Sequence, residues 1–263
     1  MTSRVDDAAG LLRFAHDLAD LADAITLPAF RAGLEVEYKA DGTEVTAADR
    51  DTELHLRRAI GRAHPGHAVL GEEAGRSGST GAPTWIIDPI DGTRNFVTGN
   101  PVWATLIALQ IDGREVLGVV SAPALGSRWD GLIDGTVRSA TQDGRPIAVS
   151  GRSLAQGEVS FGGLKYFKRA GRAGAVARLS DATSRQRGFG DFWQHCLVAS
   201  GAIEVAVEAE VNLWDLAAVK AVVEAAGGRF TDLEGRATAD GGSAVSSNGL
   251  VHDEVLALLH VDR

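Results

Sequence analysis

The segment from which the rest of the chain can be understood reads Trp85-Ile86-Ile87-Asp88-Pro89-Ile90-Asp91-Gly92-Thr93-Arg94-Asn95. Its apolar, β-branched start predicts a strand, and the proline and glycine that follow predict that the strand ends in a turn. The turn would hold two carboxylates three residues apart, an arrangement that suits a hard cation. An isolated Asp-Pro-x-Asp-Gly is more often a plain surface turn, so the interpretation depends on the rest of the sequence.

The composition is that of an ordinary globular protein. Apolar residues make up 44% of the 263 residues, so the chain can bury a large core as one domain or two tightly joined ones. The formal charge of -9 argues against a nucleic-acid-binding protein, and no apolar run is long enough to cross a membrane. The single cysteine, Cys196, excludes an intrachain disulfide. The start lacks the apolar core of a signal peptide, so we expect a cytoplasmic protein.

The first half of the chain predicts two helices and an antiparallel sheet. Apolar residues from Leu11 to Ile25 recur at helical spacing, and we expect Pro28 to help end that helix. Thr46-Ala47-Ala48-Asp49 resembles a capping box that starts a second helix, which gives Asp49 an ordinary role as a cap. Residues 74–81 look like a flexible loop and lack the Gly-Lys-Ser/Thr ending of a phosphate-binding loop. Strands are expected at residues 35–39, 68–70, 103–111, 115–122, 128–134 and 136–141.

The second half predicts shorter strands between helices. The polar segment 150–157 is expected to join two subdomains, about 1–150 and 151–263. The helix expected at 192–200 is apolar enough to be buried, which makes Cys196 a core residue rather than a nucleophile. A zinc site at His64 and His67 is not favoured, because no Cys or further His nearby completes it. The other expected elements are strands at 158–164, 202–209 and 229–231, a basic helix at 165–179, and helices at 212–226 and 253–259.

Carboxylates recur at the ends of the predicted elements. Glu72 follows one strand, Asp88 and Asp91 follow another, and Asp215 lies at a helix start, where the helix dipole favours a carboxylate in any case. Together they resemble the inositol monophosphatase superfamily, whose motifs appear in order as Lys39, Val45-Thr46-Ala47-Ala48-Asp49, Gly71-Glu72-Glu73, Asp88-Pro89-Ile90-Asp91-Gly92-Thr93 and Trp214-Asp215-Leu216-Ala217-Ala218. Five ordered motifs are far more specific than one. The chain departs from many relatives in having Val219 where they carry glycine, a change that removes no ligand.

The resemblance implies a fold and a metal site. The implied fold is α/β (α+β), a layered αβαβα sandwich of the inositol monophosphatase and fructose-1,6-bisphosphatase type, in a single phosphatase domain over residues 1–263. The resemblance also implies two or three Mg²⁺ ions per subunit, a homodimer, and inhibition by Li⁺. All-oxygen ligation is what Mg²⁺ prefers. The implied metal ligands are Glu72, Asp88, the carbonyl of Ile90, Asp91 and Asp215.

The implied reaction is hydrolysis of a phosphate monoester by an activated water. Thr93 and Asp49 would orient and activate this water, with help from Glu72. The backbone N–H groups of Gly92 and Thr93 would bind the phosphate. Lys39 would complement the acidic cluster, although a solvated lysine is an equally good interpretation.

The substrate is predicted from the residues after Gly190, which read Asp191-Phe192-Trp193-Gln194-His195 where inositol-phosphate phosphatases carry small residues. A carboxylate and aromatic rings suit a cationic substrate, and the stretch resembles the histidinol-phosphate phosphatases of histidine biosynthesis. The alternatives are an inositol-1-phosphate phosphatase, a broad-specificity sugar phosphatase, and a non-catalytic regulatory protein on the same fold. Phe192 and Trp193 can equally be core residues of a helix, without a role in substrate binding. The expected substrate-binding residues are Asp91, Gly92, Thr93, Arg94, Arg187, Asp191, Glu208 and Asp215.

Overall fold

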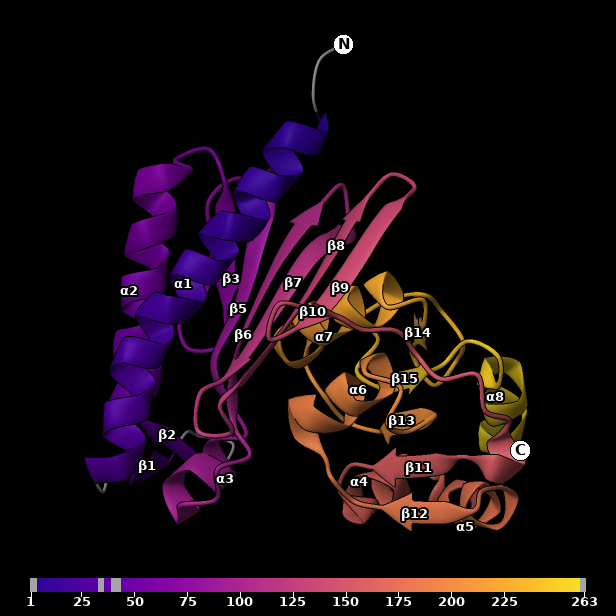
Figure 1. Cartoon of the computed structure of the whole chain (residues 1–263). Coiled ribbons are helices and arrows are strands. Elements are labelled where there is room, and N and C mark those ends of the chain that lie inside the picture. The colour runs from indigo at the N-terminus through magenta and orange to yellow at the C-terminus, as the bar shows by residue number, and fades with distance from the viewer. Residues whose placement is uncertain (1–3, 33–35, 39–43, 261–263) are drawn as a thin grey trace.

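The strand predicted from Trp85 onward, β5, lies inside an eight-stranded sheet of order β10-β9-β8-β7-β6-β5-β3-β4 (Figure 1). The structure is a computed structural model that describes residues 4–32, 36–38 and 44–260. All neighbouring strands in this sheet are antiparallel except β3 and β5. The strands are β3 (Ala68–Gly71), β4 (Gly75–Ser77), β5 (Thr84–Asp91), β6 (Ala104–Ile111), β7 (Arg114–Ala122), β8 (Ser127–Asp134), β9 (Val137–Gln142) and β10 (Arg145–Pro146).

Helices cover both faces of this sheet. Helices α1 (Arg4–Ala32) and α2 (Ala47–Ala63) cover one face, and the hairpin of β1 (Val36–Tyr38) and β2 (Glu44–Thr46) lies between them in the chain. Trp85 and Ile87 pack with α1 and α2, whereas Ile86 packs with the helices on the other face, α6 (Asp191–Ala199) and α7 (Leu213–Ala225). Because side chains of a strand alternate between faces, the continuous apolar run of β5 follows from burial on both sides.

A second sheet lies beyond α6 and α7 and has the order β12-β11-β13-β15-β14 (Figure 1). Its strands are β11 (Glu158–Phe161), β12 (Arg185–Arg187), β13 (Val205–Glu208), β14 (Arg229–Thr231) and β15 (Ala244–Ser247). Its outer face packs against α4 (Leu164–Arg169), α5 (Ala173–Ala182) and α8 (His252–His260). The layers therefore alternate as helix, sheet, helix, sheet, helix, which confirms the αβαβα sandwich.

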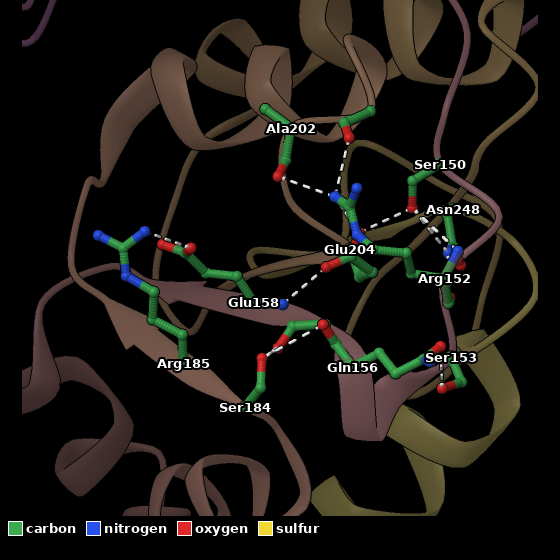
Figure 2. Close-up of polar contacts among 12 residues, drawn as sticks. Ser150, Arg152, Ser153, Gln156, Glu158, Ser184, Arg185, Ala202, Glu204 and Asn248 are labelled. Carbon is green, nitrogen blue, oxygen red and sulfur yellow. Dashed lines mark hydrogen bonds and ion pairs between the residues drawn. The ribbon is translucent and has the colours of Figure 1, made fainter.

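The segment that connects the two sheets, residues 147–157, is fastened to the second sheet by buried polar contacts (Figure 2). Glu204 is fully buried, and its carboxylate accepts hydrogen bonds from Ser150 Oγ (2.7 Å) and from the backbone N–H of Glu158 (2.6 Å). Arg152 forms an ion pair with the same carboxylate (2.6 Å), and Asn248 donates to the carbonyl of Arg152 (2.9 Å). A single turn of 3₁₀ helix, Leu154–Gln156, ends the segment.

Tertiary packing overrides two local signals in the helices. Helix α1 continues through Pro28 to Ala32, so the expected stop at the proline is wrong. Pro28 has no N–H and so cannot make the backbone hydrogen bond of that turn. The last turn of α1 is stabilised instead by Phe30, which packs on Phe96 and Trp103. The basic helix expected at 165–179 is in fact two helices, α4 and α5, because Gly171 adopts a left-handed φ of 70° that ends the first of them.

The sheets contain strands that the sequence did not predict. Residues 75–77 of the expected loop form the edge strand β4, where the guanidinium of Arg57 donates to the carbonyl of Gly75 and to Ser77 Oγ. Strands β12 and β15 are short and were also missed. The hairpin β1–β2, helix α2 with its Thr46–Asp49 capping box, and helices α6, α7 and α8 agree with the prediction. No helix among the described residues is both long and apolar enough to span a bilayer.

Candidate metal and phosphate site

Three carboxylates from the two halves of the chain meet at the end of β5. Asp88 and Asp91 lie at the end of β5, and Asp215 lies in the first turn of α7. One oxygen atom from each lies within 4.8 Å of the others. The pairing of β5 with β6 is irregular between Asp88 and Asp91, where Pro89 interrupts the ladder and its carbonyl accepts from Thr105 Oγ1 (2.8 Å). The two aspartates predicted to lie in a turn therefore lie in the irregular last part of strand β5, and the carboxylates gather there.

A backbone N–H group fixes each of these three carboxylates. Asp88 Oδ1 accepts from Ile90 N (3.0 Å), and Asp91 Oδ2 accepts from Phe192 N (2.7 Å). Asp215 Oδ2 accepts from Asn212 N (2.7 Å) as part of a capping box at the start of α7. In each carboxyl group one oxygen is held by the backbone, so the group is oriented without a cationic side chain.

Burial and mutual repulsion disfavour the ionised forms of these carboxyl groups. Burial, and then the charges of Glu72 and Asp91, raise the pKa of Asp88 well above its ordinary value. Burial, and then the charges of Asp191 and Asp215, raise the pKa of Asp91 in the same way. Burial raises the pKa of Asp215 to about 7. Within the described residues, none of the three forms an ion pair with Lys or Arg. Closely spaced carboxylate oxygens that no Lys or Arg neutralises are suited to bind a hard divalent cation.

Glu72 joins this cluster from the end of β3. It hydrogen-bonds to the side chain of Asp88, and its own backbone N–H donates to the carbonyl of Ile87 (3.3 Å). Sequence reasoning missed the residue that shapes this loop, Glu53 on the buried side of α2. Glu53 accepts from the backbone N–H of Glu73 (2.7 Å), and a Cβ on Gly71 would lie 2.4 Å from the Glu53 carboxyl group. The signal that could have found it is the Glu53–Arg57 pair at helical spacing, which forms an ion pair (2.7 Å).

Asp49 combines a structural contact with an unsatisfied oxygen. Its Oδ2 accepts from the backbone N–H (2.8 Å) and the hydroxyl (2.6 Å) of Thr46, as the cap interpretation requires. Its Oδ1 is buried and has no hydrogen-bond partner. Burial raises the pKa of Asp49 to about 6. Thr93 Oγ1 donates to the carbonyl of Ile90 (3.0 Å), and Lys39 lies outside the described residues.

A cavity of about 360 Å³ opens beside the cluster, and a second group of carboxylates lines it. Glu208, at the end of β13, is 6% exposed, and burial followed by the charge of Asp191 raises its pKa. Burial raises the pKa of Asp191 to about 6. Sequence reasoning did not place Tyr166 or His195 at this site. The residues that line the cavity include Asp91, Tyr166, Asp191, His195, Glu208 and Asp215.

Asp191 is held in an unusual backbone conformation. It follows Gly190 (φ 70°) and itself has a φ of 48°, which is rare for a residue other than glycine. Asn95 Nδ2 donates to Asp191 Oδ2 (3.0 Å), so the segment after β5 contacts the start of α6 directly. Asn95 was quoted in the sequence motif but given no role.

The remaining residues of the substrate hypothesis lie outside the cavity lining. Arg94 is exposed and forms an ion pair with Glu44 of β2. Arg187 is exposed at the end of β12, and its guanidinium donates to the carbonyl of Gln186 (2.6 Å). Phe192 is 1% exposed and packs in the core between the two sheets, together with the buried thiol of Cys196. Neither arginine is brought to the carboxylates, and Cys196 is a core residue as expected.

Comparison with known proteins identifies the family. The profile of the inositol monophosphatase family matches residues 7–261. The chain is 47% identical to the "Histidinol-phosphatase" of Mycobacterium tuberculosis, over 95% of this chain and 97% of that protein. It is 44% identical to the "Histidinol-phosphatase" of Streptomyces coelicolor, over 95% and 96% respectively. The solved structure of the Thermotoga maritima IMPase TM1415 superposes with a TM-score of 0.84 at 31% identity, over 95% and 96%. The chain belongs to the inositol monophosphatase family.

Proposed function

We propose that this chain is a Mg²⁺-dependent histidinol-phosphatase, which hydrolyses L-histidinol phosphate to L-histidinol and phosphate in histidine biosynthesis. The observation that carries the proposal is that two further carboxyl groups, those of Asp191 and Glu208, line the same cavity as Asp91 and Asp215 of the metal cluster. The names of the two bacterial relatives, at 47% and 44% identity over nearly the whole chain, support the same substrate. We propose that residues 1–263 act as one cytoplasmic phosphatase domain.

The proposed metal ligands are the oxygen atoms gathered at the end of β5. Two or three Mg²⁺ ions bound there supply the positive charge that phosphate-ester hydrolysis requires. The carboxylates of Asp88, Asp91 and Asp215 offer oxygen atoms within 4.8 Å of one another, which supports this assignment. Glu72 hydrogen-bonds to Asp88 and lies beside them. We assign Glu72, Asp88, the carbonyl of Ile90, Asp91 and Asp215 as the ligands.

Asp49 and Thr93 are the proposed groups that handle the attacking water. The unsatisfied Oδ1 of Asp49 is a free acceptor, and a pKa of about 6 leaves most of the group ionised near neutral pH. Thr93, next to Gly92, would orient the water by its hydroxyl, and Glu72 would assist in removing the proton. The oxygen of water would form the new bond to phosphorus while the bond between phosphorus and the ester oxygen breaks, and the proton that Asp49 and Glu72 remove from the water would be passed to the leaving oxygen.

The organic part of the substrate would occupy the side of the cavity lined by Asp191 and Glu208. L-Histidinol carries an ammonium group and an imidazole, and carboxylates shielded from water bind such donors strongly. We assign Asp191 and Glu208 to these groups, and the backbone of Gly92 and Thr93, with Asp91 and Asp215, to the phosphate side. Arg94 and Arg187 remain predicted to contact the substrate, although neither lines the cavity.

A substrate panel tests the proposal. Purified protein with Mg²⁺ is assayed for phosphate release from L-histidinol phosphate, inositol 1-phosphate and a sugar phosphate. We expect the highest kcat/KM with L-histidinol phosphate, by about a hundredfold, because removing buried charged partners typically costs a few kcal/mol. A higher kcat/KM with inositol 1-phosphate would contradict the substrate assignment, and no turnover of any ester would favour a regulatory protein. Light scattering of the same sample tests the proposed homodimer.

A further inference from the structure

A chain of buried hydrogen bonds leads to Glu208 from residues that the proposed reaction does not use. The backbone N–H of Phe189 donates to Ser160 Oγ (3.1 Å), and this hydroxyl donates to Gln194 Oε1 (2.7 Å). Gln194 Nε2 then donates to Glu208 Oε1. Ser160 and Gln194 are fully buried, so water does not compete for these contacts.

The donors and acceptors of this chain follow one consistent direction from Phe189 to Glu208. A backbone N–H can only donate, so Ser160 Oγ accepts from Phe189 and has its own hydrogen to give to Gln194. A glutamine whose oxygen accepts must present its NH₂ group on the other side. The reverse orientation of the Gln194 amide would place its oxygen against the Glu208 carboxylate. Glu208 therefore meets a donor at Oε1 and is held as a hydrogen-bond acceptor.

The metal cluster forms one acidic wall of the cavity, and Asp191 and Glu208 form the second. The same contacts join the segments that build this second wall. Ser160 lies on β11, Gln194 on α6 and Glu208 on β13, while Phe189 lies in the loop that leads to Asp191. The backbone N–H of Asp191 also donates to Glu208. A Cβ on Gly162 would lie 1.7 Å from Glu208 Oε2, so the glycine makes room for this carboxylate. The position of Glu208 is thus fixed from several sides.

We infer that Ser160 and Gln194 are positioning residues for substrate choice, because they hold Glu208 with an accepting carboxylate at the cavity. The wall so formed selects a phosphate ester whose organic part carries an ammonium group or N–H donors. This inference rests on the proposed function, since it assigns the organic part of the substrate to Glu208.

The test separates binding of the organic group from phosphate chemistry. Gln194→Met and Ser160→Ala are compared with the unaltered holoenzyme on L-histidinol phosphate and on p-nitrophenyl phosphate, which carries no ammonium group. We expect KM for L-histidinol phosphate to rise about tenfold and binding of L-histidinol, followed by calorimetry, to weaken by the same factor. We expect kcat on p-nitrophenyl phosphate to stay within about twofold, because the metal cluster does not touch this chain of bonds.

Gln142 provides a matched control. It accepts from Ser200 Oγ (3.1 Å) and donates to Ser127 Oγ (3.0 Å), so it bridges two groups as Gln194 does, but neither of these partners lines the cavity. Gln142→Met should change neither substrate's KM. In a Glu208→Gln background, Gln194→Met should have no further effect on KM for L-histidinol phosphate. Equal losses on both substrates, or effects that add in the double variant, would mean that Gln194 only packs the core.

The proposed function and this inference fail in different ways. If the unaltered protein prefers inositol 1-phosphate, the proposed function is wrong, and the same variants are then compared on that ester and on p-nitrophenyl phosphate. If KM for the preferred ester is unchanged in Gln194→Met, the inference is wrong, whichever ester that is.

Discussion

At the scale of single residues, the site holds like charges together by giving each carboxylate a backbone partner. A backbone N–H cannot rotate away, so it orients the group more firmly than a flexible side chain would. The bonds to Asp88, Asp91 and Asp215 do not neutralise the cluster, because burial and the neighbouring charges still raise the pKa of each one. Such a site gains stability when a cation binds.

Asp88→Asn tests this directly. The amide keeps the shape of the side chain but removes one charge from the cluster, so we expect kcat to fall by about a thousandfold or more. We also expect the rise in thermal midpoint on adding Mg²⁺ to be lost, while the metal-free protein is at least as stable as before. The buried carboxylate of Asp130, on β8 beside Thr141, is the control, and Asp130→Asn should keep both activity and the Mg²⁺ response. A full Mg²⁺ response in Asp88→Asn would contradict the ligand assignment.

His252 makes stability depend on pH. It is fully buried at the start of α8, and its two ring nitrogens contact Ser247 Oγ (2.8 Å) and Thr231 Oγ1 (2.9 Å). Burial, and then the charge of Arg229, lower the pKa of His252 to about 4. As pH falls from 7 to 5, His252 becomes protonated in the unfolded chain but stays neutral in the folded protein. The free energy of unfolding therefore falls by about 2 kcal/mol because of this residue.

The measurement is the free energy of unfolding by urea at both pH values for the unaltered protein and for His252→Gln. The variant should be less stable at pH 7, because it lacks the buried imidazole and its two hydrogen bonds. Between pH 7 and 5, however, its free energy of unfolding should fall by about 2 kcal/mol less than that of the unaltered protein. His195 is present in both proteins, and its lowered pKa contributes equally. Parallel pH profiles would show that His252 is not held neutral.

At the scale of elements, helix α7 can carry Asp215 to the cluster because two glycines let it approach the sheet. Gly118 on β7 and Gly131 on β8 are register partners. A Cβ on Gly118 would lie 2.3 Å from the carbonyl oxygen of Ala218, and one on Gly131 would lie 2.6 Å from Cα of Val222. The helix backbone therefore rests on the strands, and any added side chain must displace it.

Gly118→Ala should accordingly move α7 and the carboxylate at its start. We expect a loss of about 1–3 kcal/mol in the free energy of unfolding from overpacking, and a fall in kcat of about tenfold or more from the displaced Asp215. Gly61, on α2, has no atom within 4 Å of an added Cβ. Gly61→Ala should therefore stabilise the protein by about 0.5–1 kcal/mol and leave kcat unchanged. Equal kcat in Gly118→Ala would show that α7 tolerates the shift.

The sequence predicted elements well where burial imposed a regular pattern. The apolar patterns of β5 and α7 were readable because each is buried along its length, whereas α2 was predicted from its capping box. Short edge strands such as β4 and β12 have no such pattern, since their pairing comes from partners distant in the chain. The stop expected at Pro28 was wrong because aromatic contacts made by Phe30 are invisible in local sequence.

The same division holds for the site. Asp88, Asp91 and Asp215 could be assigned from ordered motifs, and the structure brings them together. Asn95 and Gln194 could not be assigned, because their partners lie on other elements of the fold. Glu53 has a signal in its spacing to Arg57, but the backbone groups that it holds also lie on another element. Residues that support functional groups from a distance in sequence become visible only when the chain is folded.

At the scale of the whole molecule, the cavity lies between the end of β5 in the first sheet and the ends of β11 and β13 in the second, so its shape depends on how the second sheet is fixed to the first. Residues 147–157 make one connection between the sheets, and Glu204 holds this segment on β11 and β13 (Figure 2). The segment is also tied to α7, since Val149 N donates to the carbonyl of Ala226 (3.1 Å). One buried carboxylate thus supports the connection between the halves that carry the two acidic walls.

The two ends of the Glu204–Arg152 ion pair should differ in their effect on stability. Glu204 is fully buried, and Glu204→Ala leaves Ser150 Oγ and the N–H of Glu158 without an acceptor, while Arg152 keeps only the carbonyls of Gly201 and Ala202, so we expect a loss of about 3–5 kcal/mol. The Arg152 side chain is 46% exposed, and in Arg152→Met the carboxylate of Glu204 keeps its hydrogen bonds from Ser150 Oγ and Glu158 N, so the variant should lose only about 1 kcal/mol. Urea unfolding measures both losses, and kcat of the folded fraction should be unchanged in Arg152→Met. Equal losses in the two variants would mean that the network acts as a simple surface ion pair, and that the connection between the sheets is held by apolar packing instead.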